Sequence, residues 1–227
     1  MDELKIFSIK KGIQEDNVKI ANITRSELKE KEVFMINVMS SPGSGKTSTL
    51  VRTIEKLKGE MGIGVIEADV DSDVDARSVQ NAGAKAVQMH TGGLCHLDAT
   101  MAKAGIDALE VDGLDLVFLE NIGNLICTAG YDTGAMKDIA ILSVPEGDDK
   151  PLKYPMMFER VDALIINKID VMPYFDFNMT VLEERVRKLN KDIKIFPLSA
   201  KTGEGMDAWI DWIKTEMKGG KSNESNA

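Results

Sequence analysis

The chain of 227 residues is 43% hydrophobic and 29% charged, with a net charge of −9, which is typical of a globular protein with one sizeable core. The acidic balance argues against nucleic acid as a partner, because phosphate backbones are bound by clusters of Lys and Arg. No apolar stretch approaches the ~20 residues of a membrane helix, and residues 1–5 are mostly charged, so we expect a cytoplasmic protein with no membrane or signal segment.

Apolar residues at helical spacing predict a helical extension over residues 1–30. Strands are then predicted at Val33–Met39, Gly64–Ala68, Ala84–Gln88, Leu114–Glu120, Ile139–Val144, Ala163–Asn167 and Ile193–Leu198, and helices at Thr47–Glu60, Asp73–Ala82, His96–Leu109, Asn178–Asn190 and Gly205–Lys218. Apolar strands alternating with helices predict an α/β fold, with a mainly parallel sheet flanked by helices, over residues 31–218. Residues 219–227 are small and polar and are expected to form a disordered tail.

A phosphate-binding loop is predicted at residues 40–47, which follow the first strand and open a helix. Their sequence, SSPGSGKT, fits the pattern G-x-x-x-x-G-K-[ST] except that Ser40 replaces the first Gly. We expect Lys46 to reach the terminal phosphates and Thr47 to offer its hydroxyl to Mg²⁺, while backbone N–H groups and the helix N-terminus bind the phosphates. The predicted nucleotide-binding residues are Gly43, Ser44, Gly45, Lys46, Thr47 and Ser48.

Two further motifs predict that the base is guanine. Asn167–Asp170 reads NKID and follows a strand, as the N-K-x-D signature of guanine-nucleotide-binding proteins does. Asp170 can accept hydrogen bonds from the N1–H and the exocyclic amine of guanine, which adenine does not present, and the Lys168 stem can lie across the ring. A site that needs both donors can discriminate strongly. The residues expected to bind the base are Asn167, Lys168, Asp170 and, in the loop after the last strand, Ser199, Ala200 and Lys201.

The segment after the predicted strand Leu114–Glu120 carries candidate catalytic groups. GTPases generally have D-x-x-G here, and this chain has Glu120-x-x-Gly123. We expect Glu120 to hold Mg²⁺ through its water shell and the Gly123 N–H to contact the γ-phosphate. With Lys46, these two are the predicted catalytic residues.

An acidic stretch at residues 67–75 has acids at every second position. With Asp69 as its first position it cannot be an EF-hand, because Val74 stands where Gly is required. We interpret it as a strand end that passes into a helix, with Asp69 or Asp75 assisting Mg²⁺. Asp71 and Asp73 are expected only to cap the helix.

The chain resembles the HypB family of nickel-inserting GTPases of hydrogenase maturation. The resemblance is carried by Ser40–Thr47, Ala68–Val70 with Asp75–Arg77, Thr91–Asp98, Glu120–Cys127, Pro145–Asp149 and Asn167–Asp170. It implies a dimerising P-loop fold and GTP hydrolysis coupled to nickel delivery. The implied partners are a second copy of the chain, a nickel-donating accessory protein and a hydrogenase large-subunit precursor.

The two cysteines of the sequence stand in these family blocks. Cys95 and His96 precede a predicted helix, and Cys127 follows the Glu120–Gly123 element. Two thiols and an imidazole suit Ni²⁺ or Zn²⁺, and a helix N-terminus would favour the thiolate. Three ligands leave a tetrahedral site open, for water or for a symmetry-related chain to complete. From composition alone, two buried cysteines that act as small hydrophobes, with His96 capping a helix, would be the favoured interpretation; the family resemblance reverses this preference.

Two alternatives stay open at this stage. One is the related urease-accessory GTPase, whose Cys-Pro-His metal motif does not occur in this sequence. The other is a GTP-binding switch with structural cysteines that only recruits partners.

Overall fold

The computed structural model describes residues 9–69 and 74–222. At its centre is a seven-stranded sheet in the order β3-β2-β4-β1-β5-β6-β7, in which every strand pair is parallel. The strands are β1 Phe34–Ser40, β2 Ile63–Asp69, β3 Lys85–His90, β4 Leu116–Glu120, β5 Lys137–Ser143, β6 Ala163–Asn167 and β7 Lys194–Pro197. The predicted α/β fold is confirmed.

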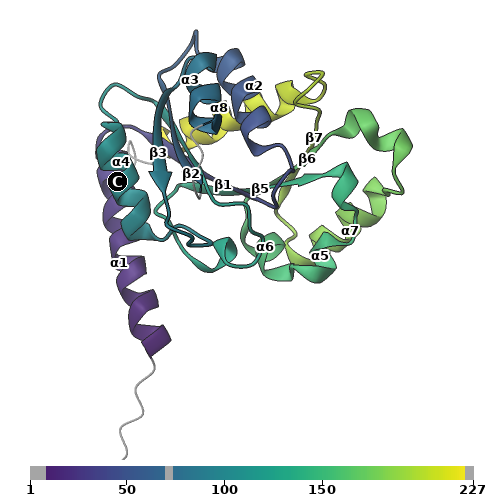
Figure 1. The fold of residues 1–227 in the computed structure, drawn as a ribbon, viewed down its shortest axis with the longest axis horizontal. Helices are drawn as coiled ribbons and strands as arrows, with labels where there is room; N and C mark the ends of the chain where they lie inside the picture. Colours follow the sequence, from purple (N-terminus) through teal and green to yellow (C-terminus); the bar gives the residue numbers. More distant parts are fainter. Residues whose placement is uncertain (1–8, 70–73, 223–227) are drawn as a thin grey trace, which may run out of the picture.

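Helices cover both faces of this sheet. They are α1 Ile9–Glu30, α2 Lys46–Leu57, α3 Val74–Ala82, α4 Ala99–Leu109, α5 Lys150–Lys153, α6 Pro155–Arg160, α7 Met179–Leu189 and α8 Met206–Ser222, with short 3-10 turns η1 Thr128–Gly130, η2 Val144–Glu146 and η3 Ile169–Tyr174. Figure 1 shows α2, α3 and α8 on one face, and α1 running past α4 on the other and projecting beyond the domain. In the part of the chain that is described, no helix is long and apolar enough to cross a membrane.

Apolar residues pack into a core on each side of the sheet. On one face Ile54 of α2 and Trp209 of α8 lie in a cluster with β1 residues such as Ile36. On the other face, α6 and α7 cover β5 and β6, while α1 and α4 cover β2 and β4. Strands buried on both faces explain the near-continuous apolar runs in the sequence.

Among the boundaries that differ from those predicted are two helix ends. The helix predicted from His96 begins at Ala99, because the Asp98 side chain accepts a hydrogen bond from the Met101 N–H and caps the helix there. The last helix continues to Ser222, so the first four residues of the predicted tail are helical. Residues 223–227 and the predicted helix start at Asp73 lie outside the described residues.

The strand order brings the predicted motifs together. In a parallel sheet the carboxyl ends of all strands meet at one edge, where ligands of open α/β folds bind. β1 lies between β4 and β5, and β6 follows β5. The phosphate loop therefore has the Glu120 segment on one side and the Asn167 segment on the other.

Candidate nucleotide and metal site

The phosphate loop forms the turn between β1 and α2. Gly43 and Gly45 have φ of 77° and 93°, a left-handed conformation that glycine adopts at no steric cost. Ser40, the departure from the usual pattern, is buried, and its hydroxyl accepts a hydrogen bond from Lys46 Nζ at 3.0 Å. The Lys46 ammonium is thus held at the end of β1, inside the loop that would receive phosphates.

Asn167 connects the phosphate loop to the base-binding segments. Its Nδ2 donates to the Ser44 carbonyl at 3.0 Å, and its Oδ1 accepts from the backbone N–H groups of Lys168 and Ala200 at 2.7 and 3.1 Å. A Cβ on Gly45 would overlap this amide group. One buried side chain therefore fixes the three predicted nucleotide motifs relative to one another.

Asp170 and Ser199, two of the predicted base-binding residues, contact each other. Ser199 Oγ donates to Asp170 Oδ1 at 2.7 Å, while Lys168 Nζ donates to the Gly43 carbonyl at 2.6 Å. From beneath, Arg52 of α2 donates to the carbonyls of Ala200 and Lys201. The carboxylate that would read the base is thus held in one orientation and keeps acceptor positions for a ligand.

Two buried glutamates face the phosphate loop. Glu67 of β2 pairs in register with Glu120 of β4, and both side chains are buried. Thr47 Oγ1 donates to Glu120 Oε1 at 3.0 Å. Burial, with the neighbouring Glu120 charge second, raises the pKa of Glu67 to about 10. Burial also raises the pKa of Glu120, against the opposing effect of Lys46.

These carboxyl groups fit a divalent cation. Glu67 Oε1 and Glu120 Oε2 are buried without a hydrogen-bond partner, which costs free energy unless a ligand supplies one. Carboxylate oxygens beside a threonine hydroxyl are the donors that Mg²⁺ prefers. Asp75 lines the same cavity. Asp69 ends β2, but its side chain lies outside the described part of the structure.

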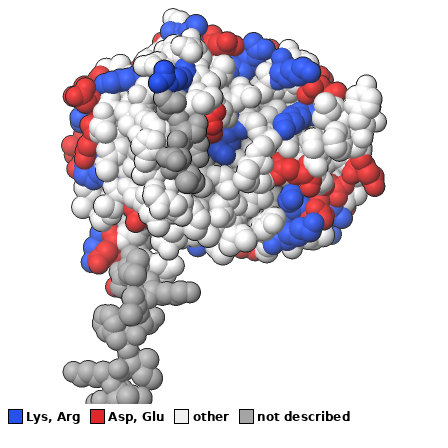
Figure 2. Space-filling view, viewed as in Figure 1, with Lys and Arg blue, Asp and Glu red and all other residues white. Residues whose placement is uncertain are grey.

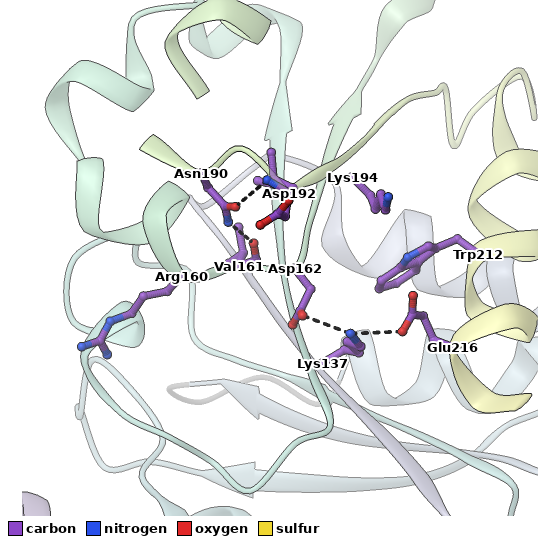
Figure 3. Close-up of a pocket in the computed structure, with 10 residues that line it drawn as sticks. Lys137, Arg160, Val161, Asp162, Asn190, Asp192, Lys194, Trp212 and Glu216 are labelled. Carbon is purple, nitrogen blue, oxygen red and sulfur yellow. Dashed lines mark hydrogen bonds and ion pairs between the residues drawn. The ribbon is translucent and has the colours of Figure 1, made fainter. Parts of the chain in front are cut away.

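Most of the predicted phosphate- and magnesium-binding residues line a cavity of about 640 Å³ at the carboxyl edge of the sheet, and Lys168 is the one predicted base-binding residue in its wall. Its walls include Lys46, Thr47, Ser48, Gly123 and Lys168. A second cavity, of about 320 Å³, opens at the amino edge of β5–β7, where Figure 3 shows Lys137 between Asp162 and Glu216. Lys137 pairs with each of the two carboxylates at 3.1 Å, and none of the predicted motifs lies there.

The predicted soft-metal ligands come near one another in the loops after β3 and β4. Cys95 Sγ lies 3.7 Å from His96 Nδ1, and the His96 ring stacks on Tyr131 at 4.0 Å. Hydrogen bonding to Cys95 raises the pKa of the Cys127 thiol. Within the described residues, no group of three or more His, Cys, Asp and Glu side chains is arranged to hold a metal ion.

The reason predicted for thiolate formation is wrong for Cys95. The residue lies in the loop ahead of α4, four positions before its first residue, Ala99, and not at the helix terminus. The dipole acts mainly within the first turn.

The loops that carry the cysteines have an uncharged surface. Residues 91–97 and 121–131 contain no Asp, Glu, Lys or Arg. Figure 2 shows a broad uncharged area on the face where these loops lie, with charged side chains toward the upper, left-hand and right-hand edges of the view. Leu94 and Ile126, each adjacent to a cysteine, are 51% and 62% exposed.

Three residues of the site were not predicted from the sequence. Glu67 stood in the acidic stretch, but its position opposite Glu120 depends on strand pairing. Glu146, in the Pro145–Asp149 block, accepts a hydrogen bond from Ser41 of the phosphate loop. Asn121 is buried directly behind Glu120. No local spacing pattern marks any of the three.

The sheet order, phosphate loop and buried carboxyl pair define this chain as a P-loop NTPase. Residues 34–197 match the CobW/HypB/UreG nucleotide-binding domain family. The chain is 42% identical to the hydrogenase maturation factor HypB of Azotobacter chroococcum mcd 1, over 95% of this chain and 71% of the relative. It belongs to the HypB family, and the resemblance seen in the sequence is confirmed.

Solved structures agree with this assignment. HypB from Helicobacter pylori in complex with nickel has a TM-score of 0.84 at 35% identity, covering 89% of this chain and 95% of that one. HypB from Archaeoglobus fulgidus has a TM-score of 0.83 at 34% identity, covering 89% of this chain and 98% of the other.

Proposed function

We propose that the protein hydrolyses GTP and delivers nickel to the precursor of a nickel-containing hydrogenase, with metal binding coupled to nucleotide state. The observation that carries the proposal is the joining of two kinds of site at one edge of the sheet. Asn167 joins the phosphate loop to the loop after β7, two of the predicted nucleotide motifs, and the loops after β3 and β4 bring Cys95 close to Cys127. Nickel is the cargo in this proposal, and GTP is the substrate.

The preference for GTP over ATP follows from Asp170. Its carboxylate is oriented by Ser199 and can accept from the two adjacent N–H donors of guanine. Adenine presents no donor at N1, so the same carboxylate would face a lone pair and lose its hydrogen bonds. Mant-GTP displacement by ATP measures this preference, and equal displacement by both nucleotides would contradict it.

The chain's own groups support phosphate transfer in defined ways. Lys46 releases Ser40 to neutralise charge on the terminal phosphates, and the Gly123 N–H donates to the γ-phosphate. Thr47, Glu67 and Glu120 would hold Mg²⁺, which neutralises charge on the phosphate oxygens when bound. Among residues 121–131 there is no Gln to orient water, so turnover is expected to be slow.

The working form is proposed to be a homodimer that shares the metal between two copies. One chain offers Cys95, His96 and Cys127 and leaves a soft-metal site incomplete. The uncharged loops and the exposed Leu94 and Ile126 suit burial against a second copy, since the cores of interfaces are depleted of charge. Zn²⁺ has the same ligand preference and is expected to compete.

Nickel titration tests the metal half of the proposal. Wild-type protein, Cys95→Ser and Cys127→Ser are titrated with GDP and with a non-hydrolysable GTP analogue, while light scattering reports the mass. Each substitution is expected to weaken nickel binding at least tenfold and to leave GTP affinity unchanged. Nickel binding that survives both substitutions would favour a GTP-binding switch with structural cysteines.

A further inference from the structure

One buried side chain joins the segment after β4 to the segment that carries Cys95. Asn121 Oδ1 accepts hydrogen bonds from the backbone N–H groups of Leu97 at 3.2 Å and Ile122 at 2.9 Å. Leu97 stands two residues beyond Cys95, and Asn121 follows Glu120 directly. A single carbonyl oxygen is therefore shared between the candidate metal segment and the nucleotide segment.

Asn121 is anchored by two further hydrogen bonds. Its backbone N–H donates to the Val38 carbonyl at 2.9 Å, and its Nδ2 donates to Asn37 Oδ1 at 3.2 Å. Asn37 in turn donates to Asp138 at 2.8 Å. Both asparagines are fully buried, where a lost hydrogen bond costs more than in water. If the hydrogen bonds at Oδ1 change, the backbone of Leu97 or Ile122 therefore moves, because Asn121 itself is held.

Of the two residues bonded to Asn121 Oδ1, Ile122 is the one on the nucleotide side. Gly123, next to Ile122, is packed against the phosphate loop, since a Cβ there would lie 3.1 Å from Pro42 Cγ. Asn121, Ile122 and Gly123 all line the nucleotide cavity. A γ-phosphate that draws in the Gly123 N–H would shift Ile122 against the shared oxygen.

The start of α4 does not depend on Asn121. Asp98 caps the helix by accepting from the Met101 N–H at 2.9 Å. Asn17 of α1 accepts from the Ala99 N–H at 2.8 Å and donates to the Asp132 carbonyl at 2.8 Å. Cys95 also contacts Cys127, and the His96 ring stacks on Tyr131. Among the described residues, the bond of Asn121 to the Leu97 N–H is the side-chain hydrogen bond that joins the Cys95 segment to the residue directly after Glu120.

Cys127 is tied to the same nucleotide segment in a different way. Asn124 Oδ1 accepts from the backbone N–H groups of Ile126 at 2.7 Å and Cys127 at 3.0 Å. This is a local turn within one loop, three residues long. It holds the backbone of Cys127, whereas Asn121 holds the backbone two residues beyond Cys95.

We propose that Asn121 is a positioning residue that transmits the nucleotide state to the Cys95–His96 segment. The inference rests on the proposed function, because it assumes that guanine nucleotides and a metal use these two segments. Coupling between two sites is reciprocal and typically changes affinities about 5- to 150-fold. A variant that lacks the Asn121 Oδ1 atom would lose this change in affinity but keep both the nucleotide site and the metal site.

The reactivity of the Cys95 thiol tests the link without any metal. Cys95 is exposed, so its alkylation by iodoacetamide can be followed by mass spectrometry of the Cys95 peptide, with GDP or with a non-hydrolysable GTP analogue bound. In wild-type protein the two rates are expected to differ about fivefold or more. In Asn121→Ala the ratio is expected to fall to within about twofold of one.

A matched control comes from the neighbouring asparagine. Asn37→Ala removes one of the two anchors of Asn121 but leaves its backbone bond to the Val38 carbonyl and its bond to Leu97, so a ratio above about twofold is expected to persist. Asn121→Ser, whose hydroxyl is too short to reach Leu97, replaces Asn121→Ala if that variant does not fold. Equal rates in wild-type protein, or a wild-type ratio in the Asn121 variant, would overturn the inference.

Nickel affinity, measured in the same variants, separates this inference from the proposed function. If the Cys95 rates depend on nucleotide through Asn121 but wild-type protein binds no nickel, the proposed function fails and the positioning role stands. If nickel affinity differs between the two nucleotides by the same factor with and without Asn121, the positioning role fails and the proposed function stands.

Discussion

Glu67 and Glu120 lie opposite each other on the neighbouring strands β2 and β4, both buried and each with one unpartnered oxygen. Two buried carboxylates so close together do not both ionise at neutral pH unless a further cation joins them, because Lys46 offsets the effect of burial only in part. The high pKa of Glu67, about 10, means that it holds its proton in the absence of such a cation. Cation binding would have to displace this proton.

Glu67→Gln is expected to raise the Mg²⁺ concentration for half-maximal GTP hydrolysis about 10- to 100-fold. Glutamine reproduces the neutral carboxyl but cannot ionise to hold the cation. In wild-type protein the Mg²⁺ requirement should fall as pH rises from 7 to 9, because Glu67 then loses its proton more readily, while the variant should show no such trend. Exposed Glu204→Gln is the control, and an unchanged Mg²⁺ requirement in Glu67→Gln would contradict this role.

The sequence predicted the fold and the motifs because each is a local pattern. Apolar runs gave the strands, and the phosphate loop and the NKID segment carry their glycines and polar residues at fixed spacing. Glu67 lacked such a signal. Its partner Glu120 is distant in sequence, and the alternation of acids around it is equally typical of a helix cap. Only the order of strands in the sheet, β2 beside β4, makes it a site residue.

The hydrogen-bonded network behind the site was equally hidden. Asn37 reads as one polar residue inside an apolar strand, and Asn121 as part of a loop. Their contact joins β1 to the residue directly after β4, and no periodicity reports it. The helices α5 and α6 escaped prediction for another reason. They are short, and Pro151 and Pro155 stand at their starts, where proline fits a helix as well as a turn.

Asp170→Asn is expected to change the preferred base from guanine to xanthine. An amide presents a donor where the carboxylate accepts, and xanthine carries an oxygen where guanine carries its amine. GTP affinity should fall about 100-fold or more, and XTP should become the better ligand. Competition against mant-nucleotides measures both.

Asp176→Asn is the matched control for this change. Asp176 lies six residues further along the same segment and is exposed, so its substitution should leave both affinities unchanged. If Asp170→Asn still bound GTP as wild-type protein does, Asp170 would not contact the base.

Gly45→Ala is expected to abolish nucleotide binding. The residue has a φ of 93°, which costs a non-glycine residue about 1 kcal/mol or more, and its new Cβ would overlap the Asn167 amide. That overlap displaces the side chain that joins the phosphate loop to the base-binding loops. Gly59→Ala, with open space around its Cβ, serves as the control, and a Gly45→Ala variant that bound GTP normally would show that the loop tolerates the shift.

Asp138→Asn is expected to stabilise the protein above pH 6. Burial raises the pKa of Asp138 to about 6, and the hydrogen bond from Asn37 only partly offsets it. Between about pH 4 and pH 6 the folded state therefore binds more protons than the unfolded chain, so this carboxyl lowers the free energy of unfolding as pH rises through that window.

Asparagine keeps the acceptor toward Asn37 and carries no charge. At pH 7.5 the variant should gain on the order of 1 kcal/mol in free energy of unfolding, a figure reduced for the partial exposure of the side chain, and at pH 4 it should gain almost nothing. Urea unfolding at both pH values measures the difference, with exposed Asp211→Asn as the control. If the variant and the wild-type protein showed parallel pH profiles, the group that titrates near pH 6 would not be Asp138.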